Sequence, residues 1–255
     1  MKILILIPLW KRPEIWRIVC RNLLAFRKSV NWDIQILTVI SPEDPDMKQL
    51  KRDCRVTGVD ICYYSNHPVG RKMNAGVNYA LHHYEFDYLM NFGSDDLIHP
   101  AIEKLYQPYF NCGCKFFGID SLYFHNYYSK ETFCFKLYTD GLACGAGRMI
   151  HRTILERMYA LDVPLYDNCQ ERSCDSKSSD RIRQYARITD TIVPSGEFPY
   201  IVDIKTNTNI NHISFIELHQ TQITKTESNF LELHYGKFQQ RAVHSDTEDR
   251  KEVCY

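Results

Sequence analysis

The first residues of the chain, MKILILIPLW, constrain its fold more than any other stretch. Residues 2–7 form an apolar run of strand length that does not alternate between polar and apolar side chains. A strand that is apolar on both faces is typical of a parallel sheet with helices packed on each side. The run is too short to span a membrane, and it meets Lys11 and Arg12 too soon for a signal peptide. We therefore expect it to be the first buried strand of an α/β domain.

Strand-length and helix-length patterns alternate along the first half of the chain. Apolar residues recur at helical spacing over residues 13–29 and 71–81, and strand-like runs cover residues 33–40, 59–64 and 86–92. This alternation predicts a doubly wound, mostly parallel sheet with right-handed crossovers. A chain of 255 residues is long enough for one such domain with its own core. The expected fold class is α/β, with a Rossmann-like mixed sheet and helices on both faces.

Charge and cysteine content argue against several classes of protein. Lys and Arg together number 31, as do Asp and Glu, so no overall basic field favours nucleic acid or an acidic membrane. The ten cysteines lack the spacing of a disulfide framework or a zinc ribbon, and several lie within apolar segments. We expect reduced thiols and a cytoplasmic protein without a membrane span.

The strand-like run FDYLMNF is followed by a turn that carries two adjacent carboxylates, Asp95 and Asp96. Open α/β sheets bind their ligands at the carboxyl ends of the strands, where this turn is expected to lie. Two carboxylates there can hold a divalent cation, whose remaining ligands are normally substrate phosphates and water. The alternative is structural, because Ser94 and the two aspartates would also cap a helix that begins near Pro100.

Two glycine-containing stretches are further candidates for ligand contact. Gly70 precedes a predicted helix, and the free N–H groups there, with Arg71 and Lys72 beside them, favour phosphate. An ordinary solvated basic turn is the alternative. Small side chains in GLACGAG, residues 141–147, leave room for a ligand or a close backbone approach, or serve a tight turn, and a helix is expected from Met149.

The polar segment YDNCQERSCDSKSSDRIR, residues 166–183, is expected to be an exposed loop that enters a helix near Ser179. Its candidates for a general base are Asp167, Glu171, Asp175 and Asp180. Asp180 also has a structural role available near the start of that helix. A late strand, residues 201–204, precedes a polar loop that ends at His212.

In this order, the segments resemble those of nucleotide-sugar glycosyltransferases with the GT-A fold, nearest to the inverting enzymes of the family 2 type. The resemblance covers roughly residues 1–213 and rests on ILIPLWKRP, VISPED, VGRKMNAGVNYAL, FGSDD, GAGRMIHR, YDNCQERSCDSKSSDRI and VDIKTNTNINH. It implies one GT-A-like domain over residues 1–213, with a nucleotide-sugar-binding half in residues 1–100 and an acceptor-binding half in residues 101–213. Residues 214–255 would form a C-terminal extension with a partly mobile tail.

The resemblance also implies a reaction and the residues that would serve it. A sugar would pass from a nucleotide-sugar donor, expected to be a UDP-sugar, to an acceptor hydroxyl by an inverting displacement assisted by Mn²⁺ or Mg²⁺. The residues expected at the donor are Pro8, Trp10, Arg12, Glu43, Asp44, Arg71, Lys72, Asn74, Ser94 and Lys205. The expected metal ligands are Asp95, Asp96 and His212, and the expected catalytic base is Asp175, with Asp180 as second choice. Gly93 stands where the family's Asp-x-Asp signature has its first aspartate.

Two other functions stay open at this level. A nucleotidyltransferase has a related sheet, but it usually carries a glycine-rich basic loop after the first strand, and PLWKRPE contains no glycine. A non-catalytic module that binds a nucleotide or a glycan would also use the carboxylates, although it has no need of an acidic loop around Asp175. The sequence leaves the acceptor open among a glycan, a protein and a hydroxylated nucleobase.

Overall fold

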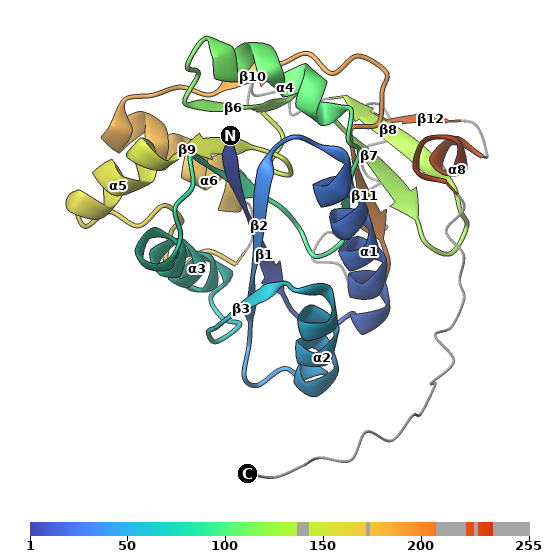
Figure 1. Ribbon diagram of the computed structural model, residues 1–255, viewed down its shortest axis with the longest axis horizontal. Helices are drawn as coiled ribbons and strands as arrows, with labels where there is room; N and C mark the ends of the chain where they lie inside the picture. Colours follow the sequence, from blue (N-terminus) through green and yellow to red (C-terminus); the bar gives the residue numbers. More distant parts are fainter. Residues whose placement is uncertain (137–142, 172–173, 208–222, 227–228, 237–255) are drawn as a thin grey trace.

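The computed structural model describes residues 1–136, 143–171, 174–207, 223–226 and 229–236. Within these residues, seven strands form the main sheet in the order β10-β6-β9-β4-β1-β2-β3 (Figure 1). They are β1 (Lys2–Leu9), β2 (Asp33–Ile40), β3 (Asp60–Tyr63), β4 (Tyr88–Asn91), β6 (Phe116–Ile119), β9 (Met149–His151) and β10 (Thr191–Val193). The neighbouring pairs are parallel except that β9 runs antiparallel to β4 and β6. The prediction of a mixed, mostly parallel sheet is confirmed.

Helices cover both faces of this sheet because its central strands are apolar on both sides. On β1, Ile3 and Ile5 belong to one buried cluster, and Leu4 and Leu6 belong to the other. The first cluster includes side chains of α1 (Pro13–Ser29), α2 (Met47–Thr57) and α4 (Ile102–Asn111), and the second includes α3 (Val69–His83) and α5 (Arg152–Ala160). Figure 1 shows α1 and α2 on one side of β1 and β2, and α3 and α5 on the other.

The helix predicted from Met149 is wrong in its first residues. Met149–His151 is strand β9, and α5 begins at Arg152. Both edges of β9 are paired, one with β4 and one with β6, so Met149 and Ile150 are buried between two neighbouring strands. A run this short has no periodicity that separates strand from helix. Its strand conformation follows from its hydrogen bonding to β4 on one side and β6 on the other.

The polar segment of residues 166–183, called the acidic segment below, also differs from its prediction. The helix expected near Ser179 already includes Cys174, since α6 spans Cys174–Arg181 and continues into a π-helical turn, Ile182–Ala186. Ser178 and Ser179 are buried, so this part of the segment packs against the protein rather than lying in an exposed loop. Asp175 is therefore a residue of the first helical turn.

A second sheet forms from strands whose pairing the sequence does not predict. Within the described residues its order is β12-β8-β7-β11-β5, with β5 (Asp96–Ile98), β7 (Ser121–Asn126), β8 (Thr132–Lys136), β11 (Ile201–Lys205) and β12 (Ile223–Lys225). The short helix α8 (Phe230–Tyr235) packs beside it, and the ring of Phe230 stacks on that of Tyr123 with 5.1 Å between centroids. Because β11 pairs with β5, a late segment of the chain lies beside the turn that follows β4.

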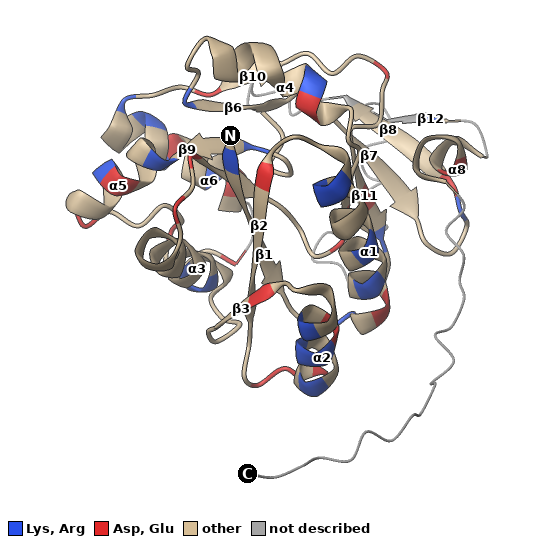
Figure 2. Ribbon diagram, viewed as in Figure 1, with Lys and Arg blue, Asp and Glu red and all other residues tan. Residues whose placement is uncertain are grey.

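Charged side chains of both signs are interspersed along the described ribbon, with cations most frequent on α2 (Figure 2). This pattern agrees with a chain in which Lys and Arg together equal Asp and Glu at 31 each. Among the helices that the structure describes, none combines the length and the apolar character needed to cross a membrane.

Candidate active site

Three carboxylates converge beyond the carboxyl end of β4. Asp95 lies in the turn after that strand, Asp96 is the first residue of β5, and Asp203 comes from β11. Asp203 is the cross-strand partner of Asp96 in the antiparallel β5–β11 pair, and the N–H of Ile204 donates to the Asp95 carbonyl at 2.8 Å. One oxygen of each carboxylate lies within 4.8 Å of the others. The structure thus places beside the predicted pair a third carboxylate that sequence reasoning missed.

The sequence held a weak signal for Asp203. In VDIK the aspartate interrupts a strand whose neighbours, Val202 and Ile204, are buried. A charge inside an apolar strand requires a partner or a function, because leaving it buried and unpaired is costly. The identity of the partner was not readable, since Asp96 lies more than 100 positions earlier in the chain.

Burial and mutual repulsion both disfavour the charged form of these carboxylates, and burial has the larger effect. Burial and the charges of Asp203 and Asp95 raise the pKa of Asp96 well above its ordinary value. Burial also raises the pKa of Asp203 to about 6, although Lys205 opposes the shift. Like charges placed directly opposite each other on adjacent strands destabilise a sheet. Cations are therefore needed close to these carboxylates.

Two cationic side chains lie against the cluster. Arg12 donates from Nη1 to Asp95 Oδ2 at 2.6 Å and from Nη2 to Ser94 Oγ at 2.9 Å. Lys205, which is buried, donates from Nζ to Asp203 Oδ2 at 2.5 Å. The backbone of Lys11 and Arg12 has φ of 58° and 60°, a left-handed conformation that is uncommon for non-glycine residues. This turn directs Arg12 from the end of β1 toward the turn after β4.

An aspartate at position 93, as in the family signature, would require the carboxylates of Asp95 and Asp96 to move. A Cβ at position 93 would lie 2.7 Å from Oδ1 of Asp95 and 2.7 Å from Oδ2 of Asp96, closer than side chains approach one another. The Gly93 N–H instead donates to Asp96 Oδ2 at 2.6 Å. Asp203 supplies from another strand a carboxylate that position 93 lacks.

The residues present fit a divalent cation. Oδ1 of Asp203 is buried, and it has no hydrogen-bond partner among the described residues. An orphaned carboxylate oxygen beside two further carboxylates is a donor set that hard cations such as Mg²⁺ and Mn²⁺ prefer. A cation there would also offset the burial and the repulsion that together raise the pKa of Asp96 and of Asp203. His212, the other predicted ligand, lies outside the described residues.

The loops after β1 and β2 are tied together beside the cluster. The carboxylate of Asp44 accepts the N–H of Lys11 at 2.6 Å through Oδ2 and the N–H of Asp46 at 2.9 Å through Oδ1. Trp10, adjacent in the chain, carries the ammonium of Lys11 over its ring at 5.3 Å.

Glu43 accepts the N–H of Asn66 at 2.6 Å. Asp44 and Glu43 therefore shape the loops here, while Pro8, at the end of β1, and the half-buried Trp10 lie at the same edge of the sheet.

Lys72 forms hydrogen bonds to the end of β1 and to the loops that follow β2 and β3. Its Nζ donates to the Leu9 carbonyl at 2.7 Å, to Ser41 Oγ at 2.9 Å and to Asn66 Oδ1 at 3.0 Å. An ammonium has three N–H donors, and these bonds occupy all of them. The side chain is 1% exposed, and burial lowers its pKa to about 7. The predicted donor residue Lys72 thus has its partners within the protein.

Replacing Lys72 by methionine is expected to change how stability depends on pH. The pKa of Lys72 is lowered by burial to about 7 in the folded protein, from 10.5 for a free side chain. Between these values the unfolded chain binds more protons, so the wild type gains up to about 1.4 kcal/mol of stability per pH unit that Lys72→Met does not gain. Urea unfolding of both proteins between about pH 7 and 9 measures this difference. Parallel pH profiles for the two proteins would contradict it.

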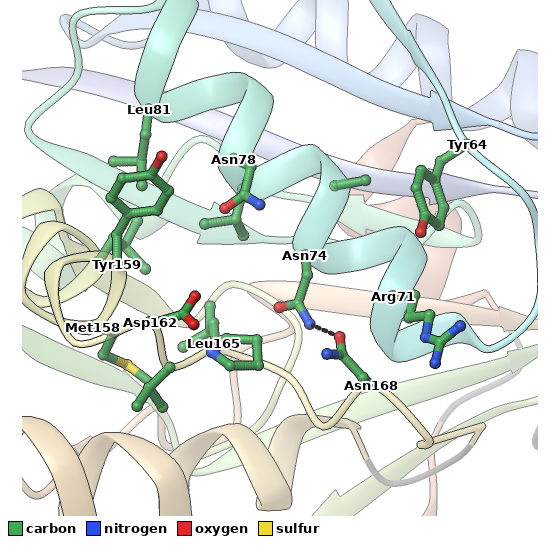
Figure 3. A pocket seen from close by; sticks show the side chains of 15 residues that line it. Tyr64, Arg71, Asn74, Asn78, Leu81, Met158, Tyr159, Asp162, Leu165 and Asn168 are labelled. Carbon is green, nitrogen blue, oxygen red and sulfur yellow. Dashed lines mark hydrogen bonds between the residues drawn. The ribbon is translucent and has the colours of Figure 1, made fainter.

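Arg71 and Asn74 line a separate cavity of about 590 Å³ between α3 and α5 (Figure 3). Asn74 donates to the Tyr166 carbonyl at 2.8 Å and to Asn168 Oδ1 at 2.9 Å, and it accepts the Tyr166 N–H at 2.9 Å. None of the three clustered carboxylates lines this cavity. Asn74 therefore fixes the start of the acidic segment instead of reaching the carboxylate cluster.

Asp175 and Asp180, the two candidates for the base, have different surroundings on α6. The carboxyl group of Asp175 lies directly against Gly145, where any Cβ would overlap it. Gly147, two residues on, donates its N–H to the carbonyl of Asn91 at the end of β4, at 2.8 Å. Asp180 is on the outside, with its side chain 55% exposed and 3.5 Å from Arg183. Residues 143–148, called the glycine turn below, thus link Asp175 to the strand that leads into the carboxylate cluster, whereas Asp180 lies on the surface.

Comparison with solved structures identifies the fold. A fragment of S. aureus TarS, residues 1–349, superposes with a TM-score of 0.55 at 10% identity, over 80% of this chain and 60% of that one. The same fragment with UDP-GlcNAc gives a TM-score of 0.52 at 11% identity, over 82% and 60%. The mannosyltransferase PcManGT from Pyrobaculum calidifontis, in complex with GDP-Man and Mn²⁺, gives 0.55 at 9% identity, over 86% and 62%. The chain thus spans about three fifths of the length of these proteins.

The fold is therefore GT-A, the fold that the sequence resemblance implied. In sequence comparisons, no family model and no curated protein matches the chain. Identities near 10% establish a shared fold but not a shared reaction.

Proposed function

We propose that the protein is a glycosyltransferase that moves a sugar from a nucleotide-sugar donor, a UDP-sugar, to an acceptor hydroxyl by an inverting displacement assisted by Mn²⁺ or Mg²⁺. One observation carries the proposal: three carboxylates lie within 4.8 Å of one another at the carboxyl end of β4, with Arg12 and Lys205 bonded to two of them. A cluster of carboxylates with adjacent cations suits a substrate that brings a diphosphate together with a metal ion.

Each part of the site has a role in this reaction. Asp95, Asp96 and Asp203 would hold the cation, which when bound would offset the charge that develops on the leaving diphosphate. Arg12 and Lys205 would supply positive charge beside it. Asp175 would take the proton of the acceptor hydroxyl as that oxygen bonds to the anomeric carbon and the bond from this carbon to the nucleotide diphosphate breaks.

The comparisons support the donor class more than the individual donor. One neighbour was solved with UDP-GlcNAc and another with GDP-Man and Mn²⁺, so a nucleotide-sugar and manganese are the first ligands to test. The division into a donor half, residues 1–100, and an acceptor half, residues 101–213, stays a prediction. Asp203, from the second half, joins the carboxylates of the first.

Binding of UDP to the protein is expected to require a divalent cation. The three carboxylates repel a diphosphate unless a cation lies between them. Isothermal titration calorimetry with UDP and with GDP, each in MnCl₂, in MgCl₂ and in EDTA, measures this directly. We expect UDP to bind with metal and not in EDTA. If UDP, GDP, CMP and dTDP all fail to bind in the presence of metal, the donor site is misassigned; the alternative of a helix cap is not left, because α4 begins at Ile102 with Ala101 as its N-cap and Asp96 belongs to β5.

A further inference from the structure

A buried arginine joins the glycine turn to the helix that carries Asp175. Arg148 is 1% exposed and immediately precedes β9. Its Nη1 donates to the carbonyl of Asp175 at 2.7 Å and to Ser179 Oγ at 2.8 Å, and its Nη2 donates to the carbonyl of Ala143. The guanidinium therefore connects two segments that lie almost 30 positions apart in the chain and that meet at Asp175.

The same two segments are in contact through the carboxyl group itself. Gly145 lies between Ala143 and Arg148, and a Cβ on it would overlap the Asp175 carboxyl. Arg148 closes the turn with its own N–H, which donates to the Gly145 carbonyl at 3.2 Å, and its carbonyl accepts the N–H of Asn91 at 3.0 Å. The position of Asp175 relative to the end of β4 is thus set through one turn and one side chain.

A residue needed only for packing would not carry a charge here. Burying a guanidinium costs more free energy than burying an apolar side chain of similar volume, so the hydrogen bonds that Arg148 makes point to a geometric task. The planar guanidinium fork holds several acceptors in a fixed arrangement, which a flexible ammonium does not. Arg148 uses two of its nitrogens to hold three oxygens, two of them on α6.

We propose that Arg148 is a positioning residue for glycosyl transfer, which holds the Asp175 carboxylate against the glycine turn and in register with the end of β4. The inference rests on the proposed function, in which Asp175 takes the acceptor proton. Loss of Arg148 would release α6 and raise the cost of bringing the base to the acceptor, without altering the carboxylate cluster that holds the donor. Its effect should therefore fall on turnover and not on donor affinity.

Arg152 provides a matched control a few residues further along the chain. It donates from Nη1 to the Tyr84 carbonyl at 2.6 Å and from Nη2 to the Leu81 carbonyl at 3.0 Å, so it also ties a loop to a helix through backbone acceptors. Its partners lie at the C-terminal end of α3, away from Asp175. Arg152→Lys is thus the same chemical change at a position outside the proposed chemistry.

The test compares Arg148→Lys with Arg152→Lys, using nucleotide release from UDP-GlcNAc and from GDP-mannose in MnCl₂, with water as the acceptor whose proton Asp175 takes. For the donor that the wild type turns over, Arg148→Lys is expected to lower kcat about 10- to 100-fold with KM within about twofold, and Arg152→Lys to change neither. Arg148→Lys added to Asp175→Asn should lower kcat no further, because the two residues act as one unit. Ser179→Ala, which removes one acceptor of Arg148, should give a smaller fall and serves if Arg148→Lys does not fold.

Amide hydrogen exchange gives a readout that needs no donor. Arg148→Lys should speed exchange in Cys174–Arg181, and Arg152→Lys should leave that helix unchanged. The inference is overturned if kcat is unaffected, if it falls equally in both lysine variants, if the effect adds to that of Asp175→Asn, or if exchange in α6 does not change. If the wild type turns over no nucleotide-sugar, the proposed function fails, and the exchange data still decide whether Arg148 holds the helix of Asp175.

Discussion

Asp203→Asn is expected to abolish metal-dependent binding of UDP and to lower turnover about 100- to 1000-fold, an effect typical of losing one group that stabilises developing charge. Asn keeps the shape of the side chain but removes the charge that a divalent cation needs. The loss should appear in calorimetry as UDP binding that no longer differs between MnCl₂ and EDTA. Asp203 is the sharpest of the three positions to test because no Asp-x-Asp reading of the sequence includes it.

The same variant is not expected to be less stable. Burial raises the pKa of Asp203 to about 6 despite the opposing charge of Lys205, whereas a free aspartate has 3.8. The folded protein therefore binds this proton more tightly than the unfolded chain, and the free energy of unfolding falls as the pH rises from about 4 to about 6. At pH 7.5 without metal, Asp203→Asn should unfold at the same urea concentration as the wild type or a higher one.

Asp53→Asn is a suitable control for this experiment. Asp53 is ion-paired with Arg17 at 3.2 Å and its side chain is 15% exposed, against 16% for Asp203, but it lies on α2 and outside the carboxylate cluster. We expect Asp53→Asn to retain metal-dependent binding of UDP. Full retention of metal dependence in Asp203→Asn would show that Asp203 is not a ligand.

Asp175→Asn is expected to lower turnover about 100- to 10,000-fold while UDP and Mn²⁺ still bind as in the wild type. An amide cannot accept the acceptor's proton, but it occupies the same space against Gly145. The measurements are nucleotide release at saturating donor and calorimetry of UDP with MnCl₂. A non-catalytic binding module would show no such separation, since it has no turnover to lose.

Asp180→Asn, on the same helix, decides between the two predicted bases. Its side chain is 55% exposed and lies 3.5 Å from the guanidinium of Arg183. We expect Asp180→Asn to keep turnover within about twofold of the wild type, as for other surface substitutions. A large fall in Asp180→Asn with normal turnover in Asp175→Asn would reverse the assignment and would also remove the basis for the role of Arg148.

Several features of this protein follow from the sequence alone. The apolar run at residues 2–7 specifies a strand buried on both faces, because it contains no polar face to leave in water. Asp95 and Asp96 follow a strand-like run, which predicts two carboxylates at a strand end. Asp175 lies in a polar segment, which makes it a candidate base. All of these are properties of contiguous residues, so local patterns suffice to read them.

The tertiary structure alone decided which distant groups meet. Asp203 reaches Asp96 through the pairing of β11 with β5, and Arg148 reaches Asp175 through the insertion of β9 between β4 and β6. Lys72 and Asn74, neighbours on one helix, point to opposite sides, one under the strand ends and one toward the acidic segment. Such contacts depend on long-range strand pairing and on side-chain direction, which are set by packing across the whole domain and leave no periodic signal in the sequence.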